Sequence, residues 1–363
     1  MIVEGAIVDA DGPRRAYVRF RDGTVVETGT PGTDSRRGRD RRIHGIVTPR
    51  PVNGHTHLGD AIATVEPKGQ SLAELVRPPH GLKFRLLAGT PRRAKIAAMR
   101  LALRRMAIEG VAATIDFREE GLAGIEDLRT AARGIDLRPV VLGRPLTRPI
   151  DPRELDAVVA AGDGVGLSAA REEPEEVRRA VARACHRAGK RFALHASEEE
   201  REPPDAYLRP RPDLLVHLSL ATADDLAAVV ANRVTVAVCP RSNALFGRRP
   251  DLALFERTGV RTLLGTDNAM FHAPSMWREL EFAYVSARLA RRPVSPAFLA
   301  RAALIEPWRW LGTPDAARVA PGMPVGPLVL RLPPEDPEYQ IVTRATEHLM
   351  VRPRPPTERG RRR

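Results

Sequence analysis

Short apolar runs alternate with amphipathic stretches along most of the chain. Eight runs have the length and composition of buried parallel strands, at 45–52, 112–117, 138–143, 164–168, 191–195, 214–217, 234–239 and 261–267. Apolar positions three and four apart predict helices over 92–109, 123–133, 152–161, 174–188, 222–231, 251–258, 275–292 and 296–304. Parallel strands need such crossover connections, and eight β/α units close a TIM-type barrel. We therefore predict an α/β fold with a (β/α)8 TIM-type barrel, and a doubly wound open sheet is the alternative.

Both ends of the chain differ from this rhythm and predict a second, smaller domain. They carry short strand-like runs at 2–8, 16–20, 24–26, 328–332 and 348–351. We predict that 1–45 and 318–351 together form a small β-sandwich domain beside a barrel over 46–317. Residues 352–363 are predicted to be a disordered basic tail. The polar segment 58–92 is too long for a plain connector and is a candidate lid or substrate loop.

Charge and cysteine content narrow the functional classes. The net charge is +13, but only four of the 58 basic residues are Lys, and much of the excess lies in 36–42 and in the tail. Aromatic residues make up 4% and do not interleave with the basic runs, so stacking platforms for nucleic acid are absent from the sequence. Two cysteines give no disulfide framework, and no apolar run is long enough to span a membrane. We expect a cytoplasmic protein with a small-molecule substrate, no specific nucleic-acid partner and no membrane, and a homo-oligomer remains open.

Histidines follow several of the predicted barrel strands. His55 and His57 follow the first apolar run and are separated by one residue, so both imidazoles point to the same side of an extended backbone. With nine His in 363 residues, roughly 0.2 such pairs arise by chance, so the pair alone is a weak signal. However, His195 ends the fifth run, His217 ends the sixth and Asp267 ends the eighth. Since a barrel builds its active site where strands end, we predict that these side chains meet there.

Any three of these four imidazoles in their neutral form, together with the Asp267 carboxylate, suit a divalent ion, most often zinc, with iron or manganese as alternatives. One position would remain for water, whose pKa such an ion lowers toward ~7. The leaving group then needs a general acid, and Glu198, three residues after His195, can enter the same mouth.

These segments together resemble the amidohydrolase superfamily, and within it the cytosine deaminase and chlorohydrolase-like branch. The resemblance covers roughly residues 45 to 330. It rests on Pro51-Val52-Asn53-Gly54-His55-Thr56-His57, His195-Ala196-Ser197-Glu198, His217, Cys239-Pro240-Arg241-Ser242-Asn243 and Leu264-Gly265-Thr266-Asp267-Asn268.

The resemblance implies a role for each matching residue. It implies that His55, His57, His195 and Asp267 hold one metal ion, and that Asp267 also accepts the proton of the water. It implies that Glu198 moves protons to a ring nitrogen and that His217 orients the water or the attacked carbon.

Three departures from the family pattern mark this chain. The fourth run ends in Gly166-Leu167-Ser168 without the Lys that bridges two metal ions in binuclear relatives, which favours a single ion. Arg50 stands where the family has Gly, and Val325-Gly326-Pro327-Leu328 replaces its usual Ala-Asp-Leu.

We therefore predict a mononuclear metal-dependent hydrolase that deaminates an amino-substituted nitrogen heterocycle. Hydrolysis of a cyclic amide of the imidazolone type, or of a halide, is the alternative on the same site. A catalytically silent barrel that acts as a binding or scaffold protein is the alternative from another class. Ser242 and Asn243 are expected to brace the loop after the seventh strand. Candidate substrate contacts are Glu66, Lys68, Gln70, Arg241, His272 and Met276.

Overall fold

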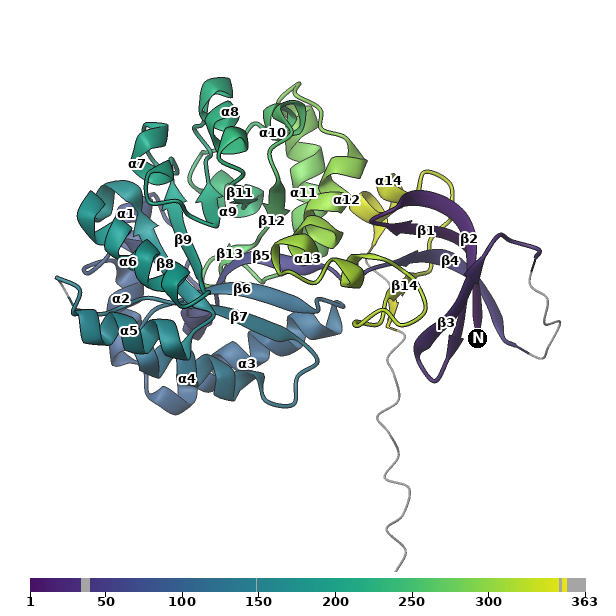
Figure 1. Ribbon diagram of the computed structural model, residues 1–363, viewed down its shortest axis with the longest axis horizontal. Coiled ribbons are helices and arrows are strands. Elements are labelled where there is room, and N and C mark those ends of the chain that lie inside the picture. Colours follow the sequence, from purple (N-terminus) through teal and green to yellow (C-terminus); the bar gives the residue numbers. More distant parts are fainter. Residues whose placement is uncertain (34–39, 148, 346–347, 351–363) are drawn as a thin grey trace, which may run out of the picture. The chain divides into compact units, whose positions relative to one another are not determined.

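The computed structural model describes residues 1–33, 40–147, 149–345 and 348–350. The chain forms two compact units, Val52–Ser295 and Met1–Pro51 with Pro296–Arg363, whereas our predicted barrel spans 46–317 (Figure 1). The predicted basic tail at 352–363 lies outside the described residues.

The larger unit holds a sheet of nine strand segments in the order β12-β11-β10-β9-β8-β7-β6-β5-β13. They are β5 (Val52–His57), β6 (Ala113–Arg118), β7 (Arg138–Gly143), β8 (Gly164–Ala169), β9 (Arg191–Ala196), β10 (Leu214–His217), β11 (Thr235–Val238), β12 (Thr262–Leu264) and β13 (Asp267–Asn268). The last two are halves of one strand, because only Gly265 and Thr266 separate them. β12 pairs with β11 and β13 pairs with β5, so the eighth strand closes the ring. The predicted TIM-type barrel is confirmed.

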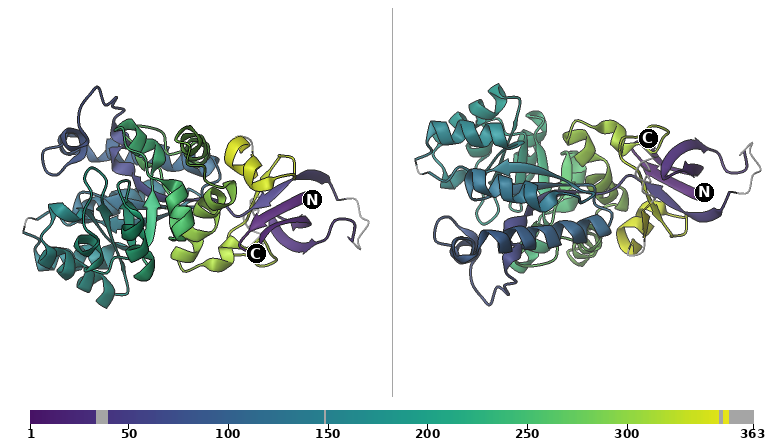
Figure 2. Two further views of the ribbon diagram at one scale, coloured as in Figure 1. Left: turned by 90° about the horizontal axis from the view of Figure 1, so that it is seen from above. Right: turned by 90° about the horizontal axis from the view of Figure 1, so that it is seen from below.

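Helices connect the strands and lie outside the ring (Figures 1 and 2). The longer ones are α3 (Arg92–Ile108), α4 (Gly121–Ala132), α5 (Pro152–Ala161), α6 (Glu175–Arg187), α8 (Ala223–Ala231), α10 (Leu252–Thr258) and α11 (Met276–Leu289). The short ones are η2 (Ala170–Glu172), α7 (Pro204–Leu208) and α9 (Pro240–Leu245). Their sequences set their positions: α3 buries Met99, Leu103 and Met106 on one face, and α8 begins with a capping box between Thr222 and Asp225.

Segment 58–92, our candidate lid or substrate loop, contains three short helices that the sequence did not predict. They are η1 (Leu58–Ile62), α1 (Leu72–Val76) and α2 (Leu82–Gly89). The side chain of Ser71 accepts from the Glu74 N–H, and the Glu74 carboxylate accepts from the Ser71 N–H, which starts α1 despite the polar surroundings. Each of these helices is short, so its apolar period is too brief to stand out in the sequence.

The apolar run at 45–52 is divided between two strands instead of forming the first barrel strand. Its first part belongs to β4 (Arg42–Thr48) in the smaller unit, and the first barrel strand, β5, begins at Val52. Pro49 and Pro51 lie between the two strands, and proline has no N–H for a sheet ladder. A continuous apolar run therefore contains a strand break that hydrophobicity alone does not show.

The smaller unit contains one mixed sheet of six described strands in the order β15-β14-β4-β1-β2-β3, which describes it more closely than the predicted sandwich. The strands besides β4 are β1 (Ile2–Asp9), β2 (Gly12–Arg21), β3 (Thr24–Gly29), β14 (Leu328–Leu330) and β15 (His348–Met350). β1 pairs with β4 in parallel and with β2 antiparallel, and β14 pairs antiparallel with β4. The pairing of β14 with β4 joins segments from the two ends of the chain. This unit also contains α12 (Pro296–Leu304), α13 (Glu306–Trp310), η3 (Pro314–Ala317) and α14 (Pro337–Arg344).

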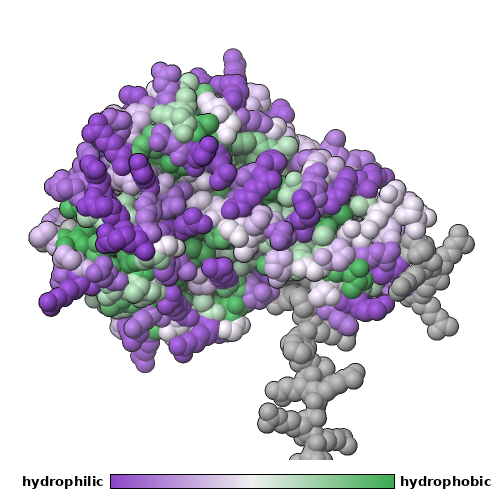
Figure 3. Space-filling view, in the orientation of Figure 1, coloured by the Kyte–Doolittle hydropathy of each residue, from purple (hydrophilic) through white to green (hydrophobic). Residues whose placement is uncertain are grey.

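On the face shown in Figure 3, hydrophobic side chains lie in scattered patches among hydrophilic ones. Among the described residues, no helix is both long enough and apolar enough to cross a membrane.

Candidate active site

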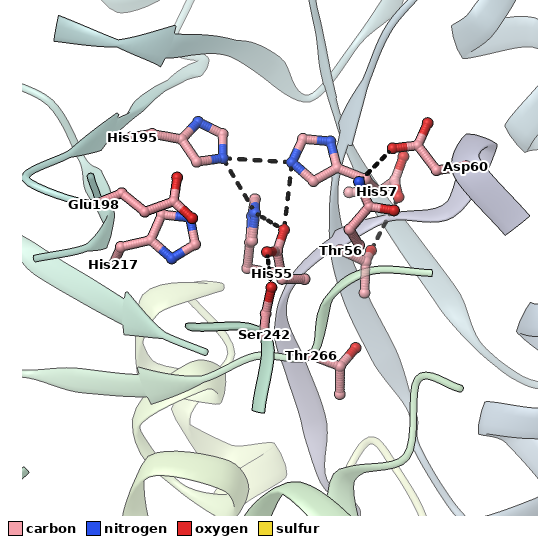
Figure 4. Close-up of polar contacts among 12 residues, drawn as sticks. His55, Thr56, His57, Asp60, His195, Glu198, His217, Ser242 and Thr266 are labelled. Atoms are coloured by element: carbon pink, nitrogen blue, oxygen red, sulfur yellow. Dashed lines mark hydrogen bonds and ion pairs between the residues drawn. The ribbon is translucent and has the colours of Figure 1, made fainter. Parts of the chain in front are cut away.

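Four barrel strands bring the predicted metal ligands and their neighbours to one place. His55 and His57 come from the end of β5, His195 from β9 and His217 from β10, and all four are buried. Figure 4 shows His55, His57 and His195 turned toward a common point, with Glu198 and His217 beside them. Asp267 joins the cluster because β13 pairs with β5 in the register that places it opposite Thr56, between the two histidines. The barrel thus assembles every residue to which we assigned a metal-binding or catalytic role.

The four predicted ligands face one another through single atoms. His55 Nε2 lies 3.2 Å from Asp267 Oδ1 and 3.3 Å from His195 Nε2. His57 Nε2 lies 3.4 Å from His195 Nε2 and 3.6 Å from Asp267 Oδ1. Around a tetrahedral ion with bonds of about 2.0–2.1 Å, neighbouring donor atoms are about 3.3–3.4 Å apart. The spacing of these donors therefore fits a zinc-sized ion.

The hydrogen bonds of the imidazoles assign their protons. His57 Nδ1 lies 3.0 Å from Glu119 Oε1, and His195 Nδ1 lies 2.9 Å from the carbonyl oxygen of Leu167. Since both partners can only accept, each Nδ1 carries the proton and each Nε2 presents a lone pair. Two lone pairs 3.4 Å apart cannot bond to each other, but both can bind one cation. The donor chemistry thus fits a divalent metal ion.

Burial keeps these groups in the protonation state that a metal ion needs. It lowers the pKa of His55 to about 4 and that of His195 well below its ordinary value, so both are neutral at pH 7. Burial opposes the charge of Asp267, but its hydrogen bond to His55 and the other imidazoles hold its pKa well below the usual range. Ser242 Oγ also donates to Asp267 Oδ2 at 2.5 Å. Neutral imidazoles beside an ionised carboxylate form a ligand set for a divalent cation.

Glu198 and His217 form a pair beside the metal ligands. His217 Nε2 lies 3.3 Å from Glu198 Oε1, and Asn243 Nδ2 lies 3.2 Å from His217 Nδ1. The Asn243 amide donates to Nδ1, which leaves the proton of His217 on Nε2. Burial raises the pKa of Glu198 well above its ordinary value and lowers that of His217 to about 3. Burial thus favours the protonated form of the Glu198 carboxyl and the neutral form of the His217 imidazole, the forms that a proton donor and an orienting group require.

Ser242 and Asn243 differ from our expectation that they brace a loop. Both are buried in α9, directly after β11, and their side chains hold Asp267 and His217 instead. Both residues that these side chains hold have a left-handed backbone conformation, since φ is 77° at His217 and 59° at Asp267. Left-handed φ is costly for such residues and is found where a site requires one orientation of a side chain.

A second layer of charges, which our sequence analysis did not identify, supports His57. Lys83 Nζ, on α2, lies 2.5 Å from Glu119 Oε1 and 3.1 Å from Asp60 Oδ2. Arg118 Nη2 lies 2.7 Å from Glu119 Oε2, and Asn268 Nδ2 donates to Asp60 Oδ2 at 2.7 Å. Burial opposes the charge of Lys83, but Asp60 and Glu119 raise its pKa above the ordinary value. Lys83 is, like our candidate Lys68, one of only four Lys in the chain, so the rarity of Lys is a signal that could have identified it.

The site lies in the wall of a cavity that is open to solvent. His57, His195, Glu198, His217 and Asp267 contribute to its wall. The remaining lining residues come largely from α1, its following residues, and the ends of β7 and β8: Leu72, Ala73, Val76, Arg77, Pro78, Lys83, Arg144, Ser168, Ala169, Arg171, Glu172, Glu199, Asn268 and Phe271.

None of the six candidate substrate contacts lines this cavity. Glu66, Lys68 and Gln70 are exposed, and Lys68 Nζ lies 3.7 Å from Glu66 Oε2. Arg241 Nε donates to Glu279 Oε2 at 2.6 Å. His272 lines a different pocket, and Met276 is buried in α11. The structure therefore brings together the metal-binding and catalytic candidates but not the candidate substrate contacts.

Comparison with known proteins places this site in a family. No established protein-family model matches the chain. A Methanothermobacter thermautotrophicus protein named "Putative aminohydrolase" is 32% identical over 355 residues, which cover 92% of this chain and 91% of the relative. An Archaeoglobus fulgidus protein of the same name is 33% identical over 240 residues, 66% of this chain and 68% of the relative.

Solved structures share the fold over nearly the whole chain. A zinc-bound adenosine deaminase from Xanthomonas campestris has a TM-score of 0.74 and 17% identity, and the match covers 94% of this chain and 88% of that one. The zinc complex of atrazine chlorohydrolase from Arthrobacter aurescens TC1 has a TM-score of 0.74 and 16% identity, with 94% and 90% covered. An amidohydrolase from a Sargasso Sea sample has a TM-score of 0.70 and 20% identity, with 95% and 89% covered. Together with the barrel and its histidine and aspartate cluster, these matches show that the chain belongs to the amidohydrolase superfamily.

Proposed function

We propose that this protein is a mononuclear metal-dependent aminohydrolase that removes the amino group of a nitrogen heterocycle. One observation carries the proposal: three of the four predicted ligands, His57, His195 and Asp267, lie in the same cavity wall as the Glu198–His217 pair. The fourth, His55, has its Nε2 3.2 Å from Asp267 Oδ1 and 3.3 Å from His195 Nε2. A ligand set alone would suit a structural metal, and a lone protonated carboxyl could be a buried structural acid. Their shared cavity gives a hydrolytic centre with its own proton donor.

His55, His57, His195 and Asp267 would hold the ion. When bound, such an ion supplies a Lewis acid that lowers the pKa of a coordinated water toward ~7. A second group of potential ligands, His57 with Asp60 and Glu119, lies alongside. The Lys83 ammonium already neutralises the carboxylates of this second group, at 3.1 Å and 2.5 Å. We therefore propose one ion rather than two.

The side chains of the site would each handle one proton or one orientation. Asp267 would accept a proton from the attacking water as its oxygen bonds to the amino-bearing carbon. Glu198, whose protonated form is favoured because burial raises its pKa, would donate a proton to the neighbouring ring nitrogen. His217, with its proton on Nε2, would donate a hydrogen bond that orients the water or the substituents of that carbon. Asp267 would then give its proton to the departing amino group, so that cleavage of the exocyclic C–N bond releases ammonia. The remaining hydroxyl proton would pass to the Glu198 carboxylate, and the ring keeps the oxygen as a carbonyl.

The comparisons support this reaction class. The two relatives at 32% and 33% identity carry the name "Putative aminohydrolase". The adenosine deaminase structure that shares the fold contains zinc, and adenosine deamination is loss of an amino group from a heterocycle.

Two measurements on the purified protein test the proposal. Elemental analysis should find about one transition-metal ion per chain, or one that a chelator removes and zinc restores. The zinc-loaded protein should release ammonia from at least one member of a panel of pyrimidines, purines, adenosine derivatives and pterins. Absence of any bound or restorable transition metal would overturn the proposal. A metal-loaded protein that releases no ammonia would reject deamination and favour cyclic amide or halide hydrolysis.

A further inference from the structure

The cavity wall contains four cationic side chains, and three of them have anionic partners. Lys83 pairs with Asp60 and Glu119. Arg77 Nη2 and Arg171 Nη2 lie 2.6 Å and 2.7 Å from Glu199 Oε2. The fourth cation is Arg144, the first residue after β7, on the face where strands deliver the catalytic residues.

Arg144 is buried without a counterion. Its exposed fraction is only 7%, yet within the part of the chain that the structure describes its guanidinium has no carboxylate partner. Its Nε is a buried donor with no hydrogen-bond partner among the described residues. The charge of Arg144 also repels that of Lys83, so the neighbouring cation does not compensate it. Burying an unpaired charge is unfavourable, so an anionic ligand that pairs with Arg144 would remove this cost.

The main chain fixes Arg144 in this place. Its N–H donates to the carbonyl oxygen of Arg118 at 2.9 Å, which continues the pairing of β7 with β6. A guanidinium presents a planar fork of donors that matches a carboxylate or a phosphate, and it remains charged at any physiological pH. The apolar side chains of Leu72, Val76 and Phe271 line the same cavity and suit the ring of a heterocycle. The cavity therefore offers separate surfaces for an apolar ring and for an anion.

We propose that the substrate is an amino-substituted heterocycle that carries an anionic group, a carboxylate or a phosphate, and that Arg144 binds this group. The inference rests on the proposed function, since it names the substrate class of the same site. Arg144 is assigned to substrate binding and takes no part in the proton transfers. The guanidinium of Arg144 would have an anionic partner only when substrate is bound.

Paired compounds test the inference by ammonia release from the zinc-loaded enzyme. Each pair differs in one anionic group: adenosine and adenosine 5′-monophosphate, pterin and pterin-6-carboxylate, cytosine and 5-carboxycytosine. We expect the anionic member of at least one pair to have the higher kcat/KM, and the pairs separate phosphate from carboxylate. Arg144→Met should lower kcat/KM for that member about 10- to 100-fold, the contribution of a charge-assisted hydrogen bond, with little effect on the neutral member. Arg144→Lys should restore part of the loss.

A binding measurement separates failure of this inference from failure of the proposed function. Zinc-loaded Glu198→Gln protein should bind the anionic compounds in calorimetry, and adding Arg144→Met should weaken binding at least tenfold. Arg93→Met removes the same charge from an exposed position on α3 and should leave binding unchanged. Arginine-dependent binding without ammonia release by wild type would keep this inference and reject deamination. Preference for the neutral members, equal losses on both members of a pair, or no binding of any anionic compound would overturn it.

The Tm of the Arg144→Met variant distinguishes a ligand-binding role of Arg144 from a structural role, because the two roles predict Tm changes of opposite sign. Because the unpaired guanidinium is costly in the free protein, Arg144→Met should raise the Tm by a few °C without ligand. The zinc content should stay at the wild-type value in the same samples. A lower Tm together with unchanged binding of anionic compounds would show a structural residue and overturn the inference.

Discussion

Glu119 contacts His57, a ligand of the proposed metal site, and replacing Glu119 with Gln tests whether this contact supports metal binding. Its Oε1 accepts from His57 Nδ1 at 3.0 Å and from Lys83 Nζ at 2.5 Å, and its Oε2 accepts from Arg118 Nη2 at 2.7 Å. Burial opposes its charge, but Lys83 and His57 hold its pKa well below the ordinary value, so it is ionised. In Glu119→Gln, one carboxylate oxygen becomes an NH₂ group that faces a cationic donor. At least one buried cation then loses one of its two carboxylate partners, because Asp60 still pairs with Lys83 and Asp116 with Arg118.

The magnitude has two parts. Loss of a partner that orients a metal-bound His typically weakens metal binding 10- to 100-fold, or about 1.4–2.7 kcal/mol. Breaking a buried ion pair from one side typically costs about 3–5 kcal/mol of folding stability. We therefore expect Glu119→Gln to bind zinc about 10- to 100-fold more weakly and to unfold at lower urea concentration, although every direct ligand remains.

The zinc Kd is measured by competition with a chromophoric chelator at neutral pH, and circular dichroism checks that the variant is folded. Glu126→Gln is the matched control. Glu126 lies nearby in sequence, on α4, but its side chain is exposed and forms only a surface ion pair, with Oε2 3.4 Å from Arg92 Nη2. Its zinc Kd should equal that of wild type. A folded Glu119→Gln protein with a zinc Kd within twofold of wild type would refute the role of this second layer.

Three further changes test other parts of the structure. Glu198→Gln should retain one zinc per chain but lose about 10²- to 10⁴-fold in kcat. Glu198 must be protonated to donate a proton, and burial raises its pKa. Wild-type kcat/KM should therefore be constant below that raised pKa and fall as the pH increases through it. The Glu198→Gln variant has no such group, so its residual activity should not show this decrease at alkaline pH. Ser242→Ala removes the 2.5 Å hydrogen bond to buried Asp267 Oδ2 and should cost roughly 1–3 kcal/mol, seen as a weaker zinc Kd or a lower urea midpoint; unchanged values for both would contradict it. Gly5→Ala would place Cβ 2.1 Å from the Gly45 carbonyl oxygen in the neighbouring strand and should destabilise the smaller unit by roughly 1–3 kcal/mol or more. Gly89→Ala is the control, because open space surrounds that position and no destabilisation is expected. Equal Tm values for the two variants would show that β1 and β4 can move apart to accept the methyl group.

The barrel could be predicted because its signal is local. Each strand is a short apolar run, each longer helix repeats its apolar positions over several turns, and both patterns can be read within about ten residues. The errors occurred where a local pattern was ambiguous or brief. The run at 45–52 looked continuous although prolines divide it between two sheets, and the helices of 58–92 were too short to show a period.

The sequence by itself determined which side chains end the strands of the barrel, and so predicted His55, His57, His195, His217 and Asp267 as one cluster. A strand fixes the direction of its side chains and a barrel fixes where its strands end, so position in sequence becomes position in space. Only the tertiary structure decided what surrounds that cluster. Lys83 contacts Glu119, 36 positions away in the sequence, and Arg144 lines the cavity with no carboxylate partner among the residues that the structure describes. No periodic pattern encodes such contacts, because they depend on how segments between the strands pack, and that packing exists only once the whole barrel has closed.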